Sequence, residues 1–197
     1  MTRPDSSDER PGADLAPQAE GLAPERTLAL VGLMGAGKTT IGRRLAQALG
    51  LAFADADAEI AAAAGQSVAE IFALHGECEF RRGERKVIER LLEQPPHVLA
   101  TGGGAFIDPR TRALMKQKAI SIWLKAPLDV LMKRVARRDD RPLLKEDDPR
   151  AVMQKLIDER YPIYAEADLV IETGNGPHHA AVSLILDALR AYLVKPV

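Results

Sequence analysis

The sequence predicts an α/β fold, a three-layer sandwich in which a five-stranded parallel sheet carries helices on both faces. Short, uninterrupted apolar runs such as Thr27–Val31 are typical of parallel strands buried on both faces. Segments of helical length separate these runs, and such alternation indicates a parallel sheet. The first run leads directly into a glycine-rich loop, residues 32–39, that opens a helix. The length of 197 residues is typical of one domain.

The predicted elements follow one another from residue 27 to the C-terminus. Strands are expected over residues 27–31, 51–54, 97–100, 119–124 and 169–171. Ser67 and Glu70 form a capping-box pattern, Asp108-Pro109 places an N-cap before a first-turn proline, and Gly50 ends the first helix. Helices are expected over residues 38–49, 57–64, 67 onward, 77–93, 108–116, 127–136, 148–164 and 177–193.

Composition excludes several classes of protein. Lys and Arg number 27 against 28 Asp and Glu, and aromatic residues make up 4%, so a nucleic-acid binder is not expected. One cysteine excludes a disulfide framework and favours the cytoplasm. No apolar run reaches the roughly 18 residues of a membrane span. Residues 1–25 contain four prolines and little apolar periodicity, which predicts a disordered tail before a domain at 26–197.

The loop at residues 32–39 reads G-L-M-G-A-G-K-T and matches the phosphate-binding pattern G-x-x-x-x-G-K-[ST] between a strand and a helix. Its glycines let backbone N–H groups surround a phosphate, and the helix N-terminus adds partial positive charge. Lys38 is expected at the β- and γ-phosphates, and the Thr39 hydroxyl at Mg²⁺. The residues expected to bind the nucleotide here are Gly35, Ala36, Gly37, Lys38, Thr39 and Thr40.

Other nucleotide-binding classes fit less well. A GTP switch reads guanine with Asn-Lys-x-Asp, whereas the single asparagine, Asn175, precedes Gly-Pro-His. A motor ATPase ends a strand in a carboxylate, but the third strand runs into Thr101 and three glycines. The carboxylate for the metal is therefore expected at the end of the second strand, where Asp55 follows Phe53-Ala54.

Two further features are ambiguous by themselves. Asp57 lies two residues after Asp55, where it could serve chemistry or cap a helix. The turn Gly102-Gly103-Gly104 could present N–H groups to an anion such as a carboxylate, or could be a flexible turn.

The combination of motifs resembles shikimate kinase. GLMGAGKTT, FADAD, GECEFRRGE, TGGG, RPLL and ERYPIY occur in the family's order, from Thr27 almost to the C-terminus. The resemblance implies the nucleoside-monophosphate-kinase fold, with a substrate lobe at about 57–94 and a lid at about 137–147. It also implies transfer of the γ-phosphate of ATP to the 3-hydroxyl of shikimate, on the route to chorismate and aromatic amino acids. One Mg²⁺ per subunit is implied, and the small-kinase size favours a monomer.

The resemblance also implies residue roles. Lys38 contacts phosphates, and Thr39 with Asp55 holds Mg²⁺. Asp57 binds shikimate hydroxyls and is the candidate general base. The carboxylate of shikimate is bound by Arg81, Arg160 and Gly102–Gly104. Arg141 in the lid contacts the transferring phosphate. Arg134 packs against adenine.

Two alternatives remain open at this point. The nearer is another small-molecule kinase of the same fold, such as a gluconate kinase, which would lack convergence of Asp57, Arg81 and Arg160 on one carboxylate-sized pocket. The other is a regulatory module that binds nucleotide without turnover. The family's adenine loop is often basic or amide-bearing, whereas here it reads Thr173-Gly-Asn-Gly-Pro-His-His179.

Overall fold

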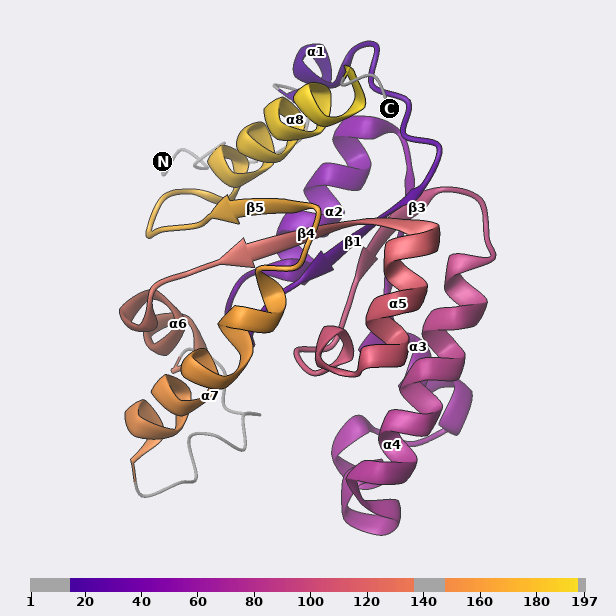
Figure 1. Cartoon of the computed structure of the whole chain (residues 1–197), viewed down its shortest axis with the longest axis vertical. Coiled ribbons are helices and arrows are strands. Elements are labelled where there is room, and N and C mark those ends of the chain that lie inside the picture. The colour runs from indigo at the N-terminus through magenta and orange to yellow at the C-terminus, as the bar shows by residue number, and fades with distance from the viewer. Residues whose placement is uncertain (1–14, 137–147, 195–197) are drawn as a thin grey trace, which may run out of the picture.

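The sheet has five parallel strands in the order β2-β3-β1-β4-β5, which confirms the predicted fold class (Figure 1). We describe a computed structural model of residues 15–136 and 148–194. The strands are β1 (Thr27–Val31), β2 (Ala52–Asp55), β3 (His97–Ala100), β4 (Ala119–Lys125) and β5 (Leu169–Glu172). Because all strands are parallel, their carboxyl ends meet at one edge of the sheet, where ligands bind in open α/β folds.

Helices cover both faces of the sheet. They are α1 (Ala16–Ala19), α2 (Lys38–Leu49), α3 (Ala56–Ala64), α4 (Val68–Leu92), α5 (Pro109–Lys118), α6 (Leu128–Val135), α7 (Pro149–Tyr164) and α8 (His178–Val194), with a 3₁₀ turn η2 at Ala105–Ile107. α2 packs against α8 on one face, and α4, α5 and α7 meet around η2 on the other. Crossovers between parallel strands are right-handed as a rule, so helices on connections that run in opposite directions along the sheet cover opposite faces.

The core surrounds the central strand. All five residues of β1 are buried, which fits a continuous apolar run covered on both faces. Leu28 and Leu30 of β1 are fully buried, as is Ile122 of β4. None of the described helices is long and apolar enough to cross a bilayer.

Residues 15–25 differ from the prediction of a disordered tail. Leu15 and Ala19 are buried in the main core, and α1 contacts α2 and α8. These contacts are with residues distant in sequence, so local composition did not indicate them. Residues 1–14 lie outside the described part of the chain.

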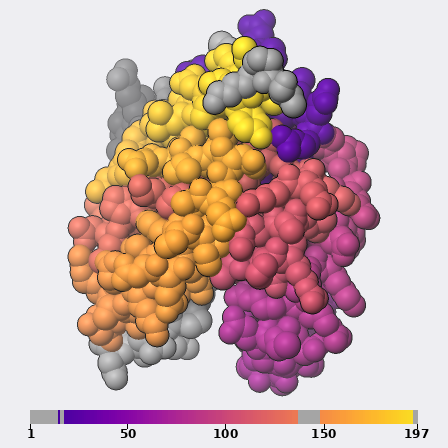
Figure 2. Space-filling model, in the orientation of Figure 1, coloured from indigo at the N-terminus to yellow at the C-terminus, as the bar shows by residue number. Residues whose placement is uncertain are grey.

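Helices α3 and α4 form the segment in which the substrate lobe was predicted. Gly76, with φ 76° and ψ 172°, interrupts α4 at the point where the sequence predicted a boundary between two helices. Ile60, Ile71 and Phe80 make a small cluster apart from the main core. Figure 2 shows this part of the molecule, in magenta, separated by a notch from the orange α7. The predicted lid, residues 137–147, lies outside the described residues.

Candidate active site

The phosphate-binding loop joins the buried end of β1 to the N-terminus of α2. Gly35 and Gly37 have φ values of 81° and 100°, in the left-handed region that favours glycine. Gly37 is the N-cap of α2 and, having no side chain, leaves the first-turn N–H groups without a side-chain acceptor. A helix start of this kind attracts an anion. Ala36, which was also predicted to bind the nucleotide, is fully buried and is not among the residues that line the cleft.

Lys38 lies inside this loop. Its Nζ donates hydrogen bonds to the carbonyl oxygens of Gly32, at 2.7 Å, and Leu33, at 3.0 Å. The ammonium group is thus held over the loop whose N–H groups would surround a phosphate.

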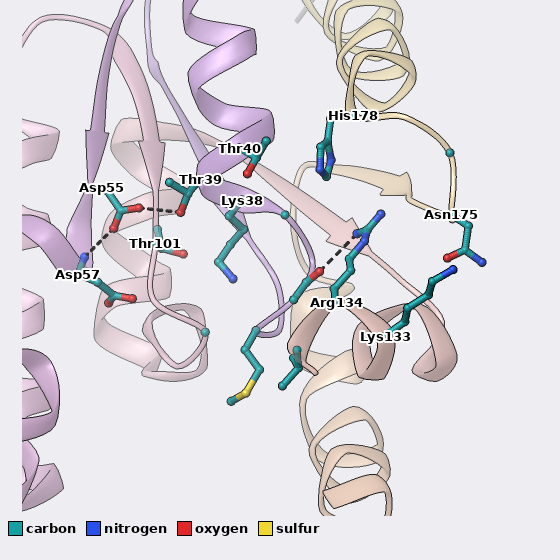
Figure 3. A pocket seen from close by; sticks show the side chains of 16 residues that line it. Lys38, Thr39, Thr40, Asp55, Asp57, Thr101, Lys133, Arg134, Asn175 and His178 are labelled. Carbon is teal, nitrogen blue, oxygen red and sulfur yellow. Dashed lines mark hydrogen bonds between the residues drawn. The ribbon is translucent and has the colours of Figure 1, made fainter. Parts of the chain in front are cut away.

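Thr39 and Asp55 are brought together across α2 and β2. The Thr39 hydroxyl donates to Asp55 Oδ2 at 2.7 Å (Figure 3). Asp55 Oδ1 caps α3 by accepting from the N–H groups of Asp57, at 3.1 Å, and Ala58. The Thr39 hydroxyl and the Asp55 carboxylate are oxygen ligands suited to Mg²⁺, which takes few protein ligands and completes its coordination shell with phosphate and water oxygens. Among the described residues, no group of three or more His, Cys, Asp or Glu side chains could hold a metal.

A cleft of about 390 Å³ runs along the carboxyl edge of the sheet (Figure 3). The phosphate-loop side contributes Gly35, Gly37, Lys38, Thr39 and Thr40, and the far wall comes from α6 and the loop after β5. Asp55, Asp57, Thr101 and Gly103 line the remaining end. Asp57 therefore shares one cavity with the phosphate loop. Of the two neighbouring aspartates, Asp55 and not Asp57 is the N-cap of α3.

Two carboxylates converge on Gly102. A Cβ atom at this glycine would lie 2.7 Å from Glu84 Oε1 and 2.8 Å from Asp57 Oδ1. Glu84 is only 2% exposed, and its Oε1 has no hydrogen-bond partner among the described residues. Burial raises the pKa of Glu84; Arg81 opposes this shift, and Asp57 adds to it. Glu84 was not among the residues predicted for the site; its spacing of three from Arg81 on a helix was the available signal.

Arg81 lies against Gly104, the last residue of the glycine turn. A Cβ atom at Gly104 would clash with the Arg81 guanidinium. Arg81 pairs with Glu84 at 2.7 Å and with Glu77 at 3.2 Å. Burial disfavours its charge, but the two carboxylates outweigh burial and raise the pKa of Arg81. Neighbouring Arg82 instead points to solvent, 62% exposed.

Arg160 reaches the same turn from α7. Its Nη1 lies 3.5 Å from the carbonyl oxygen of Gly103. The structure therefore places Asp57, Arg81 and Arg160 around Gly102, Gly104 and Gly103 respectively. All three side chains adjoin one glycine turn, and of the three only Asp57 lines the cleft.

Arg134 links the phosphate loop to the loop after β5. It donates to the carbonyl oxygens of Gly35, at 3.3 Å, Ala36, at 3.2 Å, and Gly174, at 2.6 Å. Lys133, Asn175 and His178, which the sequence analysis did not assign, line the same end of the cleft (Figure 3). Arg141 lies outside the described residues.

The chain is similar over most of its length to known shikimate kinases. The family model described as "Shikimate kinase" matches residues 34–190. A shikimate kinase of Caulobacter vibrioides is 58% identical over 174 residues, 87% of each chain. One of Paramagnetospirillum magneticum is 54% identical over 181 residues, 92% of each chain. A solved structure of the Acinetobacter baumannii shikimate kinase in complex with shikimate superposes with a TM-score of 0.83, at 37% identity, covering 91% of this chain and 99% of that one.

Proposed function

The chain belongs to the shikimate kinase family, and from this premise we propose that it transfers the γ-phosphate of ATP to the 3-hydroxyl of shikimate. The products are shikimate 3-phosphate and ADP, within the synthesis of chorismate and aromatic amino acids. The observation that carries the proposal is the arrangement of Asp57, Arg81 and Arg160 around one glycine turn beside the phosphate loop.

The phosphate loop would bind the triphosphate of ATP. Its N–H groups and the start of α2 face the anion, and Lys38 adds a point charge near the bond that breaks. Thr39 and Asp55 would hold one Mg²⁺, which neutralises phosphate charge when bound. Arg134 would pack against adenine; its bonds to Gly35 and Gly174 place it between the phosphate loop and the loop after β5.

The glycine turn would bind the carboxylate of shikimate. Arg81 and Arg160 offer planar guanidinium forks, which form paired, charge-assisted hydrogen bonds with a carboxylate. This end of the site orients the ring so that a hydroxyl faces Asp57. Two forks also favour an acid over a neutral sugar, because a carboxylate accepts stronger, charge-assisted hydrogen bonds from a guanidinium than a hydroxyl does.

Asp57 would position the 3-hydroxyl and accept its proton as the oxygen attacks the γ-phosphorus. It lines the same cleft as Lys38 and Thr39, so the accepting hydroxyl and the donor phosphate can meet there. Arg141 of the predicted lid would supply positive charge to the transferring phosphoryl group, and lid closure would exclude water.

We further propose that the enzyme works as a cytoplasmic monomer with small-molecule partners only. The near balance of 27 basic and 28 acidic residues argues against a nucleic-acid partner, and the single cysteine fits a reducing compartment. The size, typical of small kinases, favours a monomer.

The decisive experiment measures ADP formation by purified protein with ATP, Mg²⁺ and shikimate, and identifies the product by phosphorus NMR. We expect turnover that requires shikimate and a phosphate on the 3-oxygen. Gluconate and a nucleoside monophosphate serve as alternative acceptors. Turnover with either of these but not with shikimate would refute the assignment.

A further inference from the structure

Tyr164 is a fully buried tyrosine at the C-terminal end of α7. Its ring lies 6.4 Å from that of Phe106 and 5.9 Å from that of Trp123. A phenylalanine would make these ring contacts equally well. Because a buried hydroxyl destabilises the fold unless it finds a partner, the partner of the Tyr164 hydroxyl needs its own explanation.

That partner belongs to the glycine turn. The Tyr164 hydroxyl donates to the carbonyl oxygen of Gly103, the same oxygen that Arg160 Nη1 approaches at 3.5 Å. Burial raises the pKa of Tyr164 to about 12, while the hydrogen bond and charge of Arg160 act in the opposite direction. The phenol therefore keeps its proton at neutral pH and stays a donor.

The bond fixes the orientation of a peptide group in the candidate site. The Gly103 carbonyl and the Gly104 N–H belong to one trans peptide, so they point in opposite directions. With the carbonyl held toward α7, the Gly104 N–H faces away from α7. Gly104 also packs against Arg81, so one peptide connects the two guanidinium groups.

Arg160 and Tyr164 are four residues apart and therefore lie on the same face of α7. Both side chains donate to the Gly103 carbonyl oxygen, so the hydroxyl orients the acceptor that Arg160 approaches. We propose that Tyr164 is a positioning residue for carboxylate recognition: its hydroxyl holds Arg160 and the Gly103–Gly104 peptide in the geometry that binds the acid group of the substrate. The inference rests on the proposed function.

Tyr164→Phe tests the inference because it removes only the hydroxyl. The loss of one hydrogen bond that organises the site should raise the KM for shikimate by about five- to tenfold, with the KM for ATP within about twofold of wild type. The second acceptor is the shikimate analogue in which the carboxyl group is reduced to a primary alcohol. For this analogue, kcat/KM should be the same for the variant and the wild type.

Tyr161→Phe is the matched control. Tyr161 also lies on α7, packs edge-on against Trp123 at 4.9 Å, and donates its hydroxyl to a backbone carbonyl, that of Ala126, which is not part of the carboxylate site. We expect this variant to keep the wild-type KM for shikimate. Thermal unfolding of both variants separates a loss of stability from a loss of recognition.

An unchanged KM for shikimate in Tyr164→Phe would overturn the inference, as would equal losses of kcat/KM on shikimate and on the alcohol. The wild-type protein decides the proposed function separately: absence of shikimate-dependent turnover would refute the function before any variant is compared.

Discussion

Glu84 forms an ion pair with Arg81 at 2.7 Å from a position that is almost fully buried. One carboxylate oxygen binds the guanidinium, and the other lies against Gly102 beside Asp57. A buried charge needs such a partner, because its desolvation is otherwise uncompensated. Glu84 therefore fixes the fork of Arg81 next to the glycine turn.

The raised pKa of Glu84 predicts a pH dependence of stability. The folded state binds this proton more tightly than the unfolded state, so the contribution of Glu84 is most favourable below its ordinary pKa of 4.5 and is lost as pH rises through the raised value. Glu84→Gln removes this titration. We expect the difference in free energy of unfolding, wild type minus variant, to fall with pH in urea titrations between about pH 4 and 7.

Glu79→Gln controls for loss of an ion pair on the same helix. Glu79 pairs with Arg82 at 3.2 Å in an exposed position, so its loss should change stability by only about 0.2–1 kcal/mol. The raised pKa would be contradicted if the free energy of unfolding of the wild type minus that of Glu84→Gln stayed constant or rose with pH.

Arg81→Lys should weaken the binding of shikimate. A lysine keeps the charge but loses the planar fork, and each charge-assisted hydrogen bond contributes about 1.5–3 kcal/mol. We expect the KM for shikimate to rise at least about tenfold while the KM for ATP changes little. Arg82→Lys, exposed on the same helix, should leave both constants unchanged. An unaltered KM for shikimate in Arg81→Lys would show that Arg81 does not bind the substrate.

Asp57→Asn should abolish most turnover without loss of nucleotide binding. The amide keeps the size of the side chain beside Gly102 but cannot accept the hydroxyl proton. A general base contributes about 10²- to 10⁴-fold, so kcat should fall within this range. ATP affinity, measured by calorimetry, should remain within about twofold. A near-normal kcat would exclude the role of Asp57 as base.

Asp55→Asn should raise the requirement for Mg²⁺. Asparagine caps a helix about as well as aspartate, so α3 keeps its bonds from Asp57 and Ala58 N–H and the melting temperature should hold. The neutral amide is a weaker partner for a hard cation. We expect the Mg²⁺ concentration at half-maximal rate to rise about tenfold. The same midpoint as wild type would separate Asp55 from the metal.

The sequence predicted best what is determined locally. The bounds predicted for the first strand and for the helix at 38–49 match β1 and α2, because an apolar run and the glycines at 37 and 50 define them. The second strand was predicted one residue early; its extent depends on pairing with His97–Ala100. Nothing in the sequence indicated that Leu15, in the predicted disordered tail, packs into the main core.

In the candidate site, too, the sequence predicted what local motifs determine and missed what depends on long-range contacts. The motifs identified Lys38, Asp57, Arg81 and Arg160 as site candidates. In the structure Lys38 and Asp57 line the cleft, and Asp57, Arg81 and Arg160 lie beside the glycine turn. Glu84 and Tyr164 lay within these motifs. The spacing of Glu84 from Arg81 indicates an ion pair, but nothing local shows that Glu84 or Tyr164 is buried. Only their contacts with Gly102 and Gly103 reveal their place.

Gly102→Ala should disturb the carboxylate pair directly. The added methyl would lie 2.7 Å from Glu84 Oε1 and 2.8 Å from Asp57 Oδ1, closer than real Cβ contacts, so both side chains must shift. We expect destabilisation of about 1–3 kcal/mol in urea unfolding, together with a loss of kcat/KM for shikimate. Gly83→Ala is the control: it lies in α4 with open space around its Cβ position, so it should stabilise the protein by about 0.5–1 kcal/mol and leave the kinetics unchanged. Wild-type stability and kinetics in Gly102→Ala would mean that Asp57 and Glu84 do not converge on this glycine in solution.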